Sequence, residues 1–161
     1  EFIGYSYDGA DASFELLARR IIGEIPRYIS ISEYDVSVKK NSAGKIISSA
    51  KAHLEVDGEK ILCEGEGNGP VNALDNAIRQ NVDKLVKYSE YLKDLKLVDY
   101  KVRILNTGTE AVTRVSIEST DSKGKNWFTI GVSTNIIDAS FKALIDSLDY
   151  KLFKDNAPAS L

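Results

Sequence analysis

The sequence matches itself at an offset of 66 residues, and this internal repeat constrains the fold more than any other feature. The matched pairs are Gly58 and Gly124, Gly65 and Gly131, Ala73 and Ala139, Ala77 and Ala143, and Tyr34 and Tyr100. A repeat of this length that occurs twice indicates a supersecondary unit that was copied once, not a solenoid array. We expect the two copies to bury their apolar faces against each other and to bind a ligand at the seam. A binding or regulatory module is therefore favoured over an enzyme.

Both copies show the same order of three strands and one helix. The first copy has strand patterns over 29–38, 46–56 and 60–65 and a helix pattern over 71–88, and the second has strands over 97–105, 111–120 and 126–132 and a helix over 135–150. Asp57-Gly58 predicts a tight hairpin turn, and 121–124 predicts its counterpart. With the glycines aligned, Val115 and Ile117 are one residue out of phase with the second strand of the first copy. We therefore expect a bulge or a different turn length in one copy.

These patterns predict an α+β fold of two pseudo-symmetric β-β-β-α units, with antiparallel strands and helices packed on one face. An amphipathic helix pattern over 11–23 precedes them and is assigned to a linker. We divide the chain into a linker segment (1–28) and a second domain (29–161) that comprises the first unit (29–94), the second unit (95–152) and a tail (153–161).

Composition excludes several kinds of partner. The chain has 161 residues and a net charge of −3, so it has no basic field that would favour nucleic acid. Its apolar runs are shorter than the ~20 residues that span a bilayer, so no membrane partner is expected. A single cysteine gives no disulfide framework and fits a reducing cytoplasm. Because the chain lacks methionine and begins Glu1-Phe2, we expect it to be a piece of a longer protein.

Residues that could form a catalytic or metal centre are sparse. His53 is the only histidine, and it lies in a strand pattern. Cys63 alternates with polar residues and is interpreted as a small buried apolar side chain. Without a second histidine or a paired cysteine, zinc-ligand spacing is absent. We therefore expect neither catalytic nor metal-ligating residues here, and no cofactor.

The segment 65–70, with sequence GEGNGP, has three glycines at alternate positions and opens a helix. One interpretation is a tight turn from strand to helix, with Pro70 at the first helical position, where its missing N–H costs nothing. The other is a ligand site, because helix N-termini attract carboxylates and phosphates, and glycine lets a ligand approach the main chain. The second copy keeps one glycine, Gly131, and has Ser133, Thr134 or Asn135 to cap its helix. The extra glycines of the first copy thus favour room for a ligand or another chain.

Longer motifs carry a family resemblance over 29–152. The runs GEGNGPVNAL (65–74), VDYKVRI (98–104), GTEAVTRV (108–115) and NIIDAS (135–140) together resemble the C-terminal regulatory domain of the 2-isopropylmalate synthase and citramalate synthase family. The leader YDGADASFELL (7–17) is more similar to the citramalate synthase branch.

The resemblance implies an acyltransferase parent in which a metal-dependent TIM barrel, upstream of this segment, condenses acetyl-CoA with a 2-oxo acid. This segment itself would not be an enzyme. It would form a homodimer, bind a branched-chain amino acid as feedback inhibitor and act on the catalytic domain of the same chain. The citramalate synthase branch implies isoleucine as the effector. The alternatives are the same domain of a 2-isopropylmalate synthase, which senses leucine, and a structural dimerisation domain without a ligand.

The resemblance also implies ten effector-binding residues. They are Gly67, Gly69, Val71, Asn72, Ala73, Leu97, Tyr100, Ile104, Thr134 and Ile136. Their chemistry suits an amino acid, because helix N-termini supply N–H groups for its carboxylate and apolar residues supply a slot for its side chain. Isoleucine and leucine differ there by methyl placement, which is worth only about 1–3 kcal/mol.

Overall fold

The computed structural model describes residues 9–105 and 111–161, and the chain divides into two compact units. The N-terminal unit contains Arg27–Lys93 and Pro158–Leu161. The C-terminal unit contains the chain up to Pro26 and Asp94–Ala157. Each unit thus contains one copy of the repeat. Within the described residues, no helix combines the length and apolar character that crossing a membrane requires.

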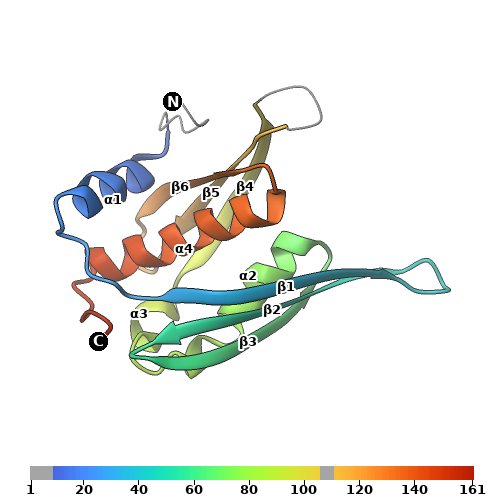
Figure 1. Ribbon diagram of the computed structural model, residues 1–161, viewed down its shortest axis with the longest axis horizontal. Coiled ribbons are helices and arrows are strands. Elements are labelled where there is room, and N and C mark those ends of the chain that lie inside the picture. The colour runs from blue at the N-terminus through green and yellow to red at the C-terminus, as the bar shows by residue number, and fades with distance from the viewer. Residues whose placement is uncertain (1–8, 106–110) are drawn as a thin grey trace. The chain divides into compact units, whose positions relative to one another are not determined.

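The N-terminal unit is a three-stranded antiparallel sheet with a helix on one face (Figure 1). Its elements are β1 (Ser30–Lys40), β2 (Ile46–Val56), β3 (Glu59–Gly67), α2 (Pro70–Arg79), the 3₁₀ helix η1 (Val82–Lys84) and α3 (Ser89–Leu92). Helix α2 packs mainly on β2 and β3. Ala50, Ala52 and Leu54 alternate along β2 and are fully buried, as expected for a strand with one covered face.

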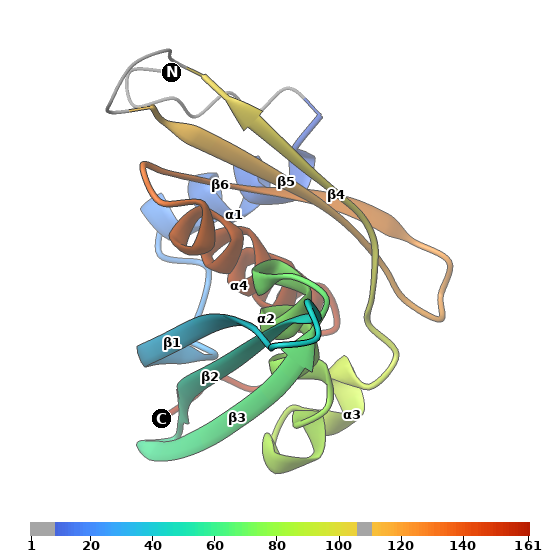
Figure 2. The same cartoon turned by 90° about the vertical axis from the view of Figure 1, so that its right-hand side faces the viewer.

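The C-terminal unit repeats this arrangement. Its elements are α1 (Asp11–Ile21), β4 (Lys96–Ile104), β5 (Thr113–Thr120), β6 (Asn126–Ser133) and α4 (Ile136–Lys154). The strands form an antiparallel sheet in the order β4-β5-β6, and α4 lies over β5 and β6 (Figure 2). The predicted α+β fold of two β-β-β-α units is therefore confirmed.

The glycines and alanines of the repeat lie where each helix contacts its sheet. A Cβ added at Gly65 would lie 2.3 Å from the backbone nitrogen of Ala77, and one at Gly131 would lie 1.9 Å from the carbonyl oxygen of Ala139. Neither distance is possible between real atoms, so only glycine permits these helices to pack this closely. The 66-residue period thus records the same helix–sheet contact built twice.

The two hairpins that follow the second strands differ in length, so a different turn length, one of the two expected alternatives, is confirmed. Asp57 and Gly58 form a two-residue turn between paired Val56 and Glu59, with positive φ at both turn residues (52° and 77°). In the C-terminal unit, 121–125 separate the last paired residues of β5 and β6. The longer turn shifts the pairing of β5 by one residue, so that Val115 pairs with Gly131 as Ala50 pairs with Gly65. The apolar residues of β5 therefore lie on the buried face, as those of β2 do.

Helix α2 is shorter than the helix predicted over 71–88, and that prediction is wrong at its C-terminal end. The amide nitrogen Nδ2 of Asn81 donates to the carbonyls of Ala77, at 2.7 Å, and Glu64, at 2.8 Å. The Ala77 carbonyl would otherwise accept from the backbone of residue 81 in a continuing helix. The side chain thus replaces the helical bond and fastens the chain to the free edge of β3.

Helix α1, assigned from the sequence to a linker segment, packs on α4 and β6. Ser13 Oγ accepts a hydrogen bond from the backbone nitrogen of Ile130 on β6, at 2.9 Å, and donates to Asp146 of α4, at 3.0 Å. Because β6 is an edge strand, its outward-facing amides would otherwise be exposed for pairing with another chain. The helix therefore protects the edge of this sheet.

A buried carboxyl group lies at the contact between α1 and α4. Arg20 of α1 donates to Asp146 and to Asp149 of α4, each at 2.8 Å. Asp149 is 8% exposed. Burial raises the pKa of Asp149 to about 7, neighbouring Asp146 also raises it, and Arg20 opposes the shift.

The pKa of Asp149 predicts pH-dependent stability. A carboxyl group whose pKa is higher in the folded than in the unfolded state stabilises the fold below pH 4, and this contribution is lost as pH rises towards 7. We expect Asp149→Asn to flatten the decline in the free energy of unfolding between pH 4 and pH 8, measured by urea denaturation. Asp138→Asn, which alters a partly exposed ion pair with Lys142 on the same helix, is the control. An unchanged decline in Asp149→Asn would contradict the assignment.

Candidate functional site

The N-terminus of α2 has no side-chain cap. Its N-cap residue is Gly69, in an extended conformation, and Pro70 occupies the first helical position. The backbone N–H groups of Val71 and Asn72 follow, and a glycine offers them no side-chain acceptor. The first turn therefore presents N–H groups and the positive end of the helix dipole, which together suit a carboxylate.

The equivalent end of α4 is capped by a side chain. Asn135 occupies the position 66 residues after Gly69. Its Oδ1 atom accepts from the backbone nitrogens of Ile137, at 2.8 Å, and Asp138, at 3.2 Å. These are the counterparts of Val71 and Asn72. Of the three residues predicted to cap this helix, Ser133, Thr134 or Asn135, the cap is thus Asn135. The two copies differ in whether a side chain of the protein already accepts from the first amides of the helix.

The two additional glycines of the first copy have different surroundings. A Cβ at Gly67 would lie 2.5 Å from Asn72 Oδ1 and 2.6 Å from the backbone nitrogen of Ala73, so this glycine makes room for α2 itself. A Cβ at Gly69 would have no atom within 4 Å. The Asn72 side chain accepts from the backbone nitrogen of Asn68, at 3.2 Å, and so braces the turn. Gly69 is therefore the glycine that leaves open space.

Sequence reasoning did not single out Ser48, which pairs with Gly67 in the sheet. Ser48 is fully buried, and its hydroxyl has no hydrogen-bond partner in the described part of the chain. In the second copy Thr113 occupies the equivalent register position, opposite Ser133, although the 66-residue offset aligns Ser48 with Arg114. A hydroxyl group thus occurs at this register position in both sheets.

The candidate residues of β4 share one face of their sheet. Tyr100 pairs with Ile117, Ile104 with Thr113 and Leu97 with Ser119, and these partners on β5 are buried on the α4 side. Leu97 and Tyr100 are three positions apart and would face opposite sides of a regular strand. An irregularity in pairing between Leu97 and Asp99 brings them to the same face.

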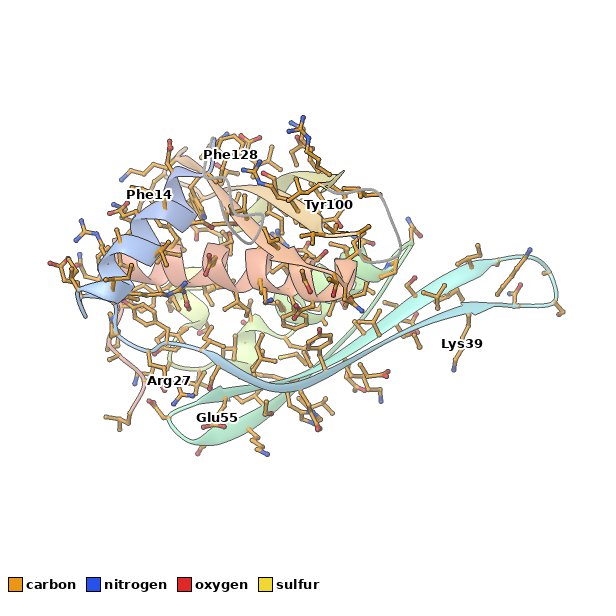
Figure 3. All side chains as sticks on the ribbon, turned by 45° about the horizontal axis from the view of Figure 1, so that its top comes forward. Phe14, Arg27, Lys39, Glu55, Tyr100 and Phe128 are labelled. Atoms are coloured by element: carbon orange, nitrogen blue, oxygen red, sulfur yellow. The ribbon has the colours of Figure 1, made fainter. Side chains whose placement is uncertain are left out.

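Helix α4 leaves part of that face uncovered. Tyr100, which is labelled in Figure 3, is half-buried, Val102 is 41% exposed and Ile104 is 65% exposed. The same three positions of β1 hold Tyr34, Val36 and Val38, and Val38 is 55% exposed. Each unit therefore carries an apolar stripe on its first strand.

Thr134 and Ile136 lie where β6 passes into α4, and both are exposed. Ser140 Oγ donates to the carbonyl of Ile136, at 2.6 Å, and lies 3.2 Å from the hydroxyl of Tyr100. The structure thus joins Tyr100 and Ile136 through a residue that sequence reasoning gave no role. Comparison of the copies could have found it, because residue 74, 66 positions before Ser140, is leucine.

The ten candidates therefore form two groups, one in each unit. Gly67, Gly69, Val71, Asn72 and Ala73 belong to the N-terminal unit, and Leu97, Tyr100, Ile104, Thr134 and Ile136 belong to the C-terminal unit. Ala73 lies on the buried face of α2 and is fully buried. The first group offers N–H donors, and the second offers apolar side chains and one tyrosine.

Other chemically notable residues have ordinary surroundings. Residues 9–105 and 111–161 contain no group of three or more His, Cys, Asp and Glu side chains that could hold a metal ion. Cys63 is a buried free thiol whose pKa is raised by burial. His53 Nδ1 lies 2.9 Å from Glu33 Oε1 on β1. These residues give the described chain no alternative site.

A hollow of about 580 Å³ lies on the N-terminal unit beside the ion pair of Lys51 and Glu64. Its lining is Ser49, Ala50, Lys51, Glu64, Gly65, Glu66 and Gln80. None of the ten candidates contributes to it. Because its charged side chains are exposed and Lys51 already pairs with Glu64, it does not compete with the helix end as a candidate site.

Comparisons with known proteins identify the family of the chain. A family model described as the LeuA allosteric (dimerisation) domain matches residues 8–152. The (R)-citramalate synthases of Geobacter sulfurreducens and Aquifex aeolicus are 46% and 44% identical to the chain, each over 94% of it and over 28% and 29% of their own lengths. A 2-isopropylmalate synthase of Clostridium acetobutylicum is 36% identical over 65% of the chain and 17% of its own length. The chain thus spans under a third of these relatives.

Proposed function

Because the chain belongs to the LeuA allosteric (dimerisation) domain family, we propose that it is the feedback-regulatory domain of a citramalate synthase and binds isoleucine as inhibitor. The relatives named (R)-citramalate synthase, at 38–46% identity over most of the chain, support this branch. In this proposal an upstream catalytic domain of the same polypeptide condenses acetyl-CoA with pyruvate, and isoleucine regulates it.

The observation that carries the proposal is the uncapped N-terminus of α2. Gly69 leaves the amides of Val71 and Asn72 without a side-chain acceptor, whereas Asn135 fills the same position in α4. A free helix end binds a carboxylate through N–H groups and the helix dipole. The carboxylate of an amino acid is such a ligand, and the N-terminal unit supplies its site.

The apolar stripe of β4 supports recognition of an aliphatic side chain. Tyr100, Val102 and Ile104 lie on one face, and α4 leaves that face partly uncovered. An aliphatic group that covers it removes apolar area from water, which is favourable by about 25 cal/mol per Å². The C-terminal unit thus provides chemistry suited to a branched side chain.

A second copy of the chain is the proposed protein partner. Val38, Val102 and Ile104 are exposed aliphatic residues on the first strand of each unit. Burial of such residues is a common source of stability in homodimers. The dimeric state is tested by light scattering after size-exclusion chromatography, and a monomer at micromolar concentration would contradict it.

Calorimetric titration with isoleucine, leucine and valine tests the effector. We expect isoleucine to bind most tightly, with about a 10- to 200-fold preference if the slot distinguishes methyl placement. A preference for leucine would favour the regulatory domain of a 2-isopropylmalate synthase. Absence of binding by all three amino acids would favour a purely structural dimerisation domain.

A further inference from the structure

The hydrogen bonds of Ser140 determine what Tyr100 can donate. Ser140 has one hydroxyl proton, and it is donated to the carbonyl of Ile136, at 2.6 Å, because a carbonyl oxygen only accepts. In the contact of 3.2 Å between the two hydroxyls, Tyr100 must therefore be the donor and Ser140 the acceptor. The single hydroxyl proton of Tyr100 is thus already used within the protein.

From this geometry we infer that Ser140 is a positioning residue of the effector site. Ser140 holds Tyr100 so that the tyrosine ring, and not the tyrosine hydroxyl, contacts the aliphatic side chain of the effector. The inference rests on the proposed function. A carboxylate requires hydrogen-bond donors, and Tyr100 has none left for it. The ring remains available on the same face of β4 as Val102 and Ile104.

The two copies of the repeat support a specific role for Ser140. Tyr100 corresponds to Tyr34, whereas Ser140 corresponds to Leu74, which belongs to α2 and is fully buried. The equivalent site therefore accepts a larger apolar side chain, and Ser140 is not needed merely to fill it. A fully buried serine is tolerated here because both of its hydrogen bonds are satisfied.

The link also connects β4 to the first turn of α4. Helix α4 packs mainly on β5 and β6, so the half-buried Tyr100 reaches from the uncovered strand to the helix through Ser140. Holding a tyrosine ring before binding lowers the entropy lost when a ligand orders it. Loss of the link should therefore weaken binding moderately, by about three- to tenfold.

A double-mutant cycle tests the inference. Isoleucine and leucine are titrated calorimetrically into the wild-type chain, Tyr100→Phe, Ser140→Ala and the double variant. Because both single substitutions remove the same hydrogen bond, we expect each to weaken binding by about three- to tenfold and the double variant to be no weaker than either. Ser147→Ala is the matched control, since Ser147 is another buried serine of α4, bonded to Ser119 and Trp127. It should lower the melting temperature and leave the affinity unchanged.

The outcomes separate the inference from the proposed function. Additive effects, or a larger loss in Tyr100→Phe than in Ser140→Ala, would mean that the tyrosine hydroxyl contacts the effector directly, and would overturn the inference. Wild-type affinity in Ser140→Ala would overturn it as well. If the wild-type chain binds neither amino acid, the proposed function itself fails.

Discussion

Gly69→Asn is expected to weaken effector binding by about 10- to 100-fold, because charge-assisted hydrogen bonds of about 1.5–3 kcal/mol are lost. The new side-chain oxygen would accept from the amides of Val71 and Asn72, as Asn135 does from the amides of the second and third residues of α4. The site would then be occupied by the protein itself. Stability should not fall, since asparagine is as good an N-cap as glycine or better by a few tenths of a kcal/mol. Calorimetry and thermal denaturation of the same sample measure both effects.

Gly69→Ala is the matched control. It adds a Cβ to the same open space but no acceptor, so it should retain most of the affinity. Equal losses in Gly69→Ala and Gly69→Asn would indicate that bulk at this position, not occupation of the amides, prevents binding. Wild-type affinity in Gly69→Asn would contradict the assignment of the carboxylate site to the N-terminus of α2.

Gly131→Ala should destabilise the fold by about 3 kcal/mol or more, at the upper end of what overpacking costs. The added methyl would lie 1.9 Å from the Ala139 carbonyl oxygen and 2.9 Å from the backbone nitrogen of Ala143. Both contacts are with the backbone of α4, so no side-chain rotation relieves them and the helix must move off the sheet. Urea denaturation measures the loss, and Gly65→Ala should behave similarly because its contact with Ala77 is 2.3 Å.

Gly69→Ala also serves as the control for stability, because its Cβ meets no atom within 4 Å. A loss in Gly131→Ala no larger than in Gly69→Ala would show that α4 adjusts at little cost. The alignment of glycine and alanine positions would then need another explanation than helix–sheet contact.

The order of the elements could be predicted because each pattern has a local cause. Alternating burial along β2 and β5 follows from one covered face, and Asp57-Gly58 adopts the positive φ values that a two-residue hairpin needs. The end of α2 could not be predicted this way. Asn81 ends the helix by bonding the carbonyl of Glu64 on β3, a partner 17 residues away in the sequence.

The candidate site likewise has features that the sequence predicts and features that only the structure shows. The contrast between Gly69 and Asn135 is visible in the sequence, since it depends only on whether a residue at the helix end has a side-chain acceptor. The separate surroundings of Gly67 and Gly69 are not visible there. Gly67 is needed for the close approach of α2, whereas Gly69 faces open space. In the sequence both are simply glycines at alternate positions before a helix.

By itself, the sequence determined the duplicated β-β-β-α unit and the broken symmetry between its copies, because turns, caps and alternating faces depend on neighbouring residues. Only the tertiary structure decided that Ser140 holds Tyr100 and that Ser13 and Arg20 fasten α1 to its unit. These hydrogen bonds join residues 40 to 133 positions apart. Such partners are chosen by packing in three dimensions, which no local pattern encodes.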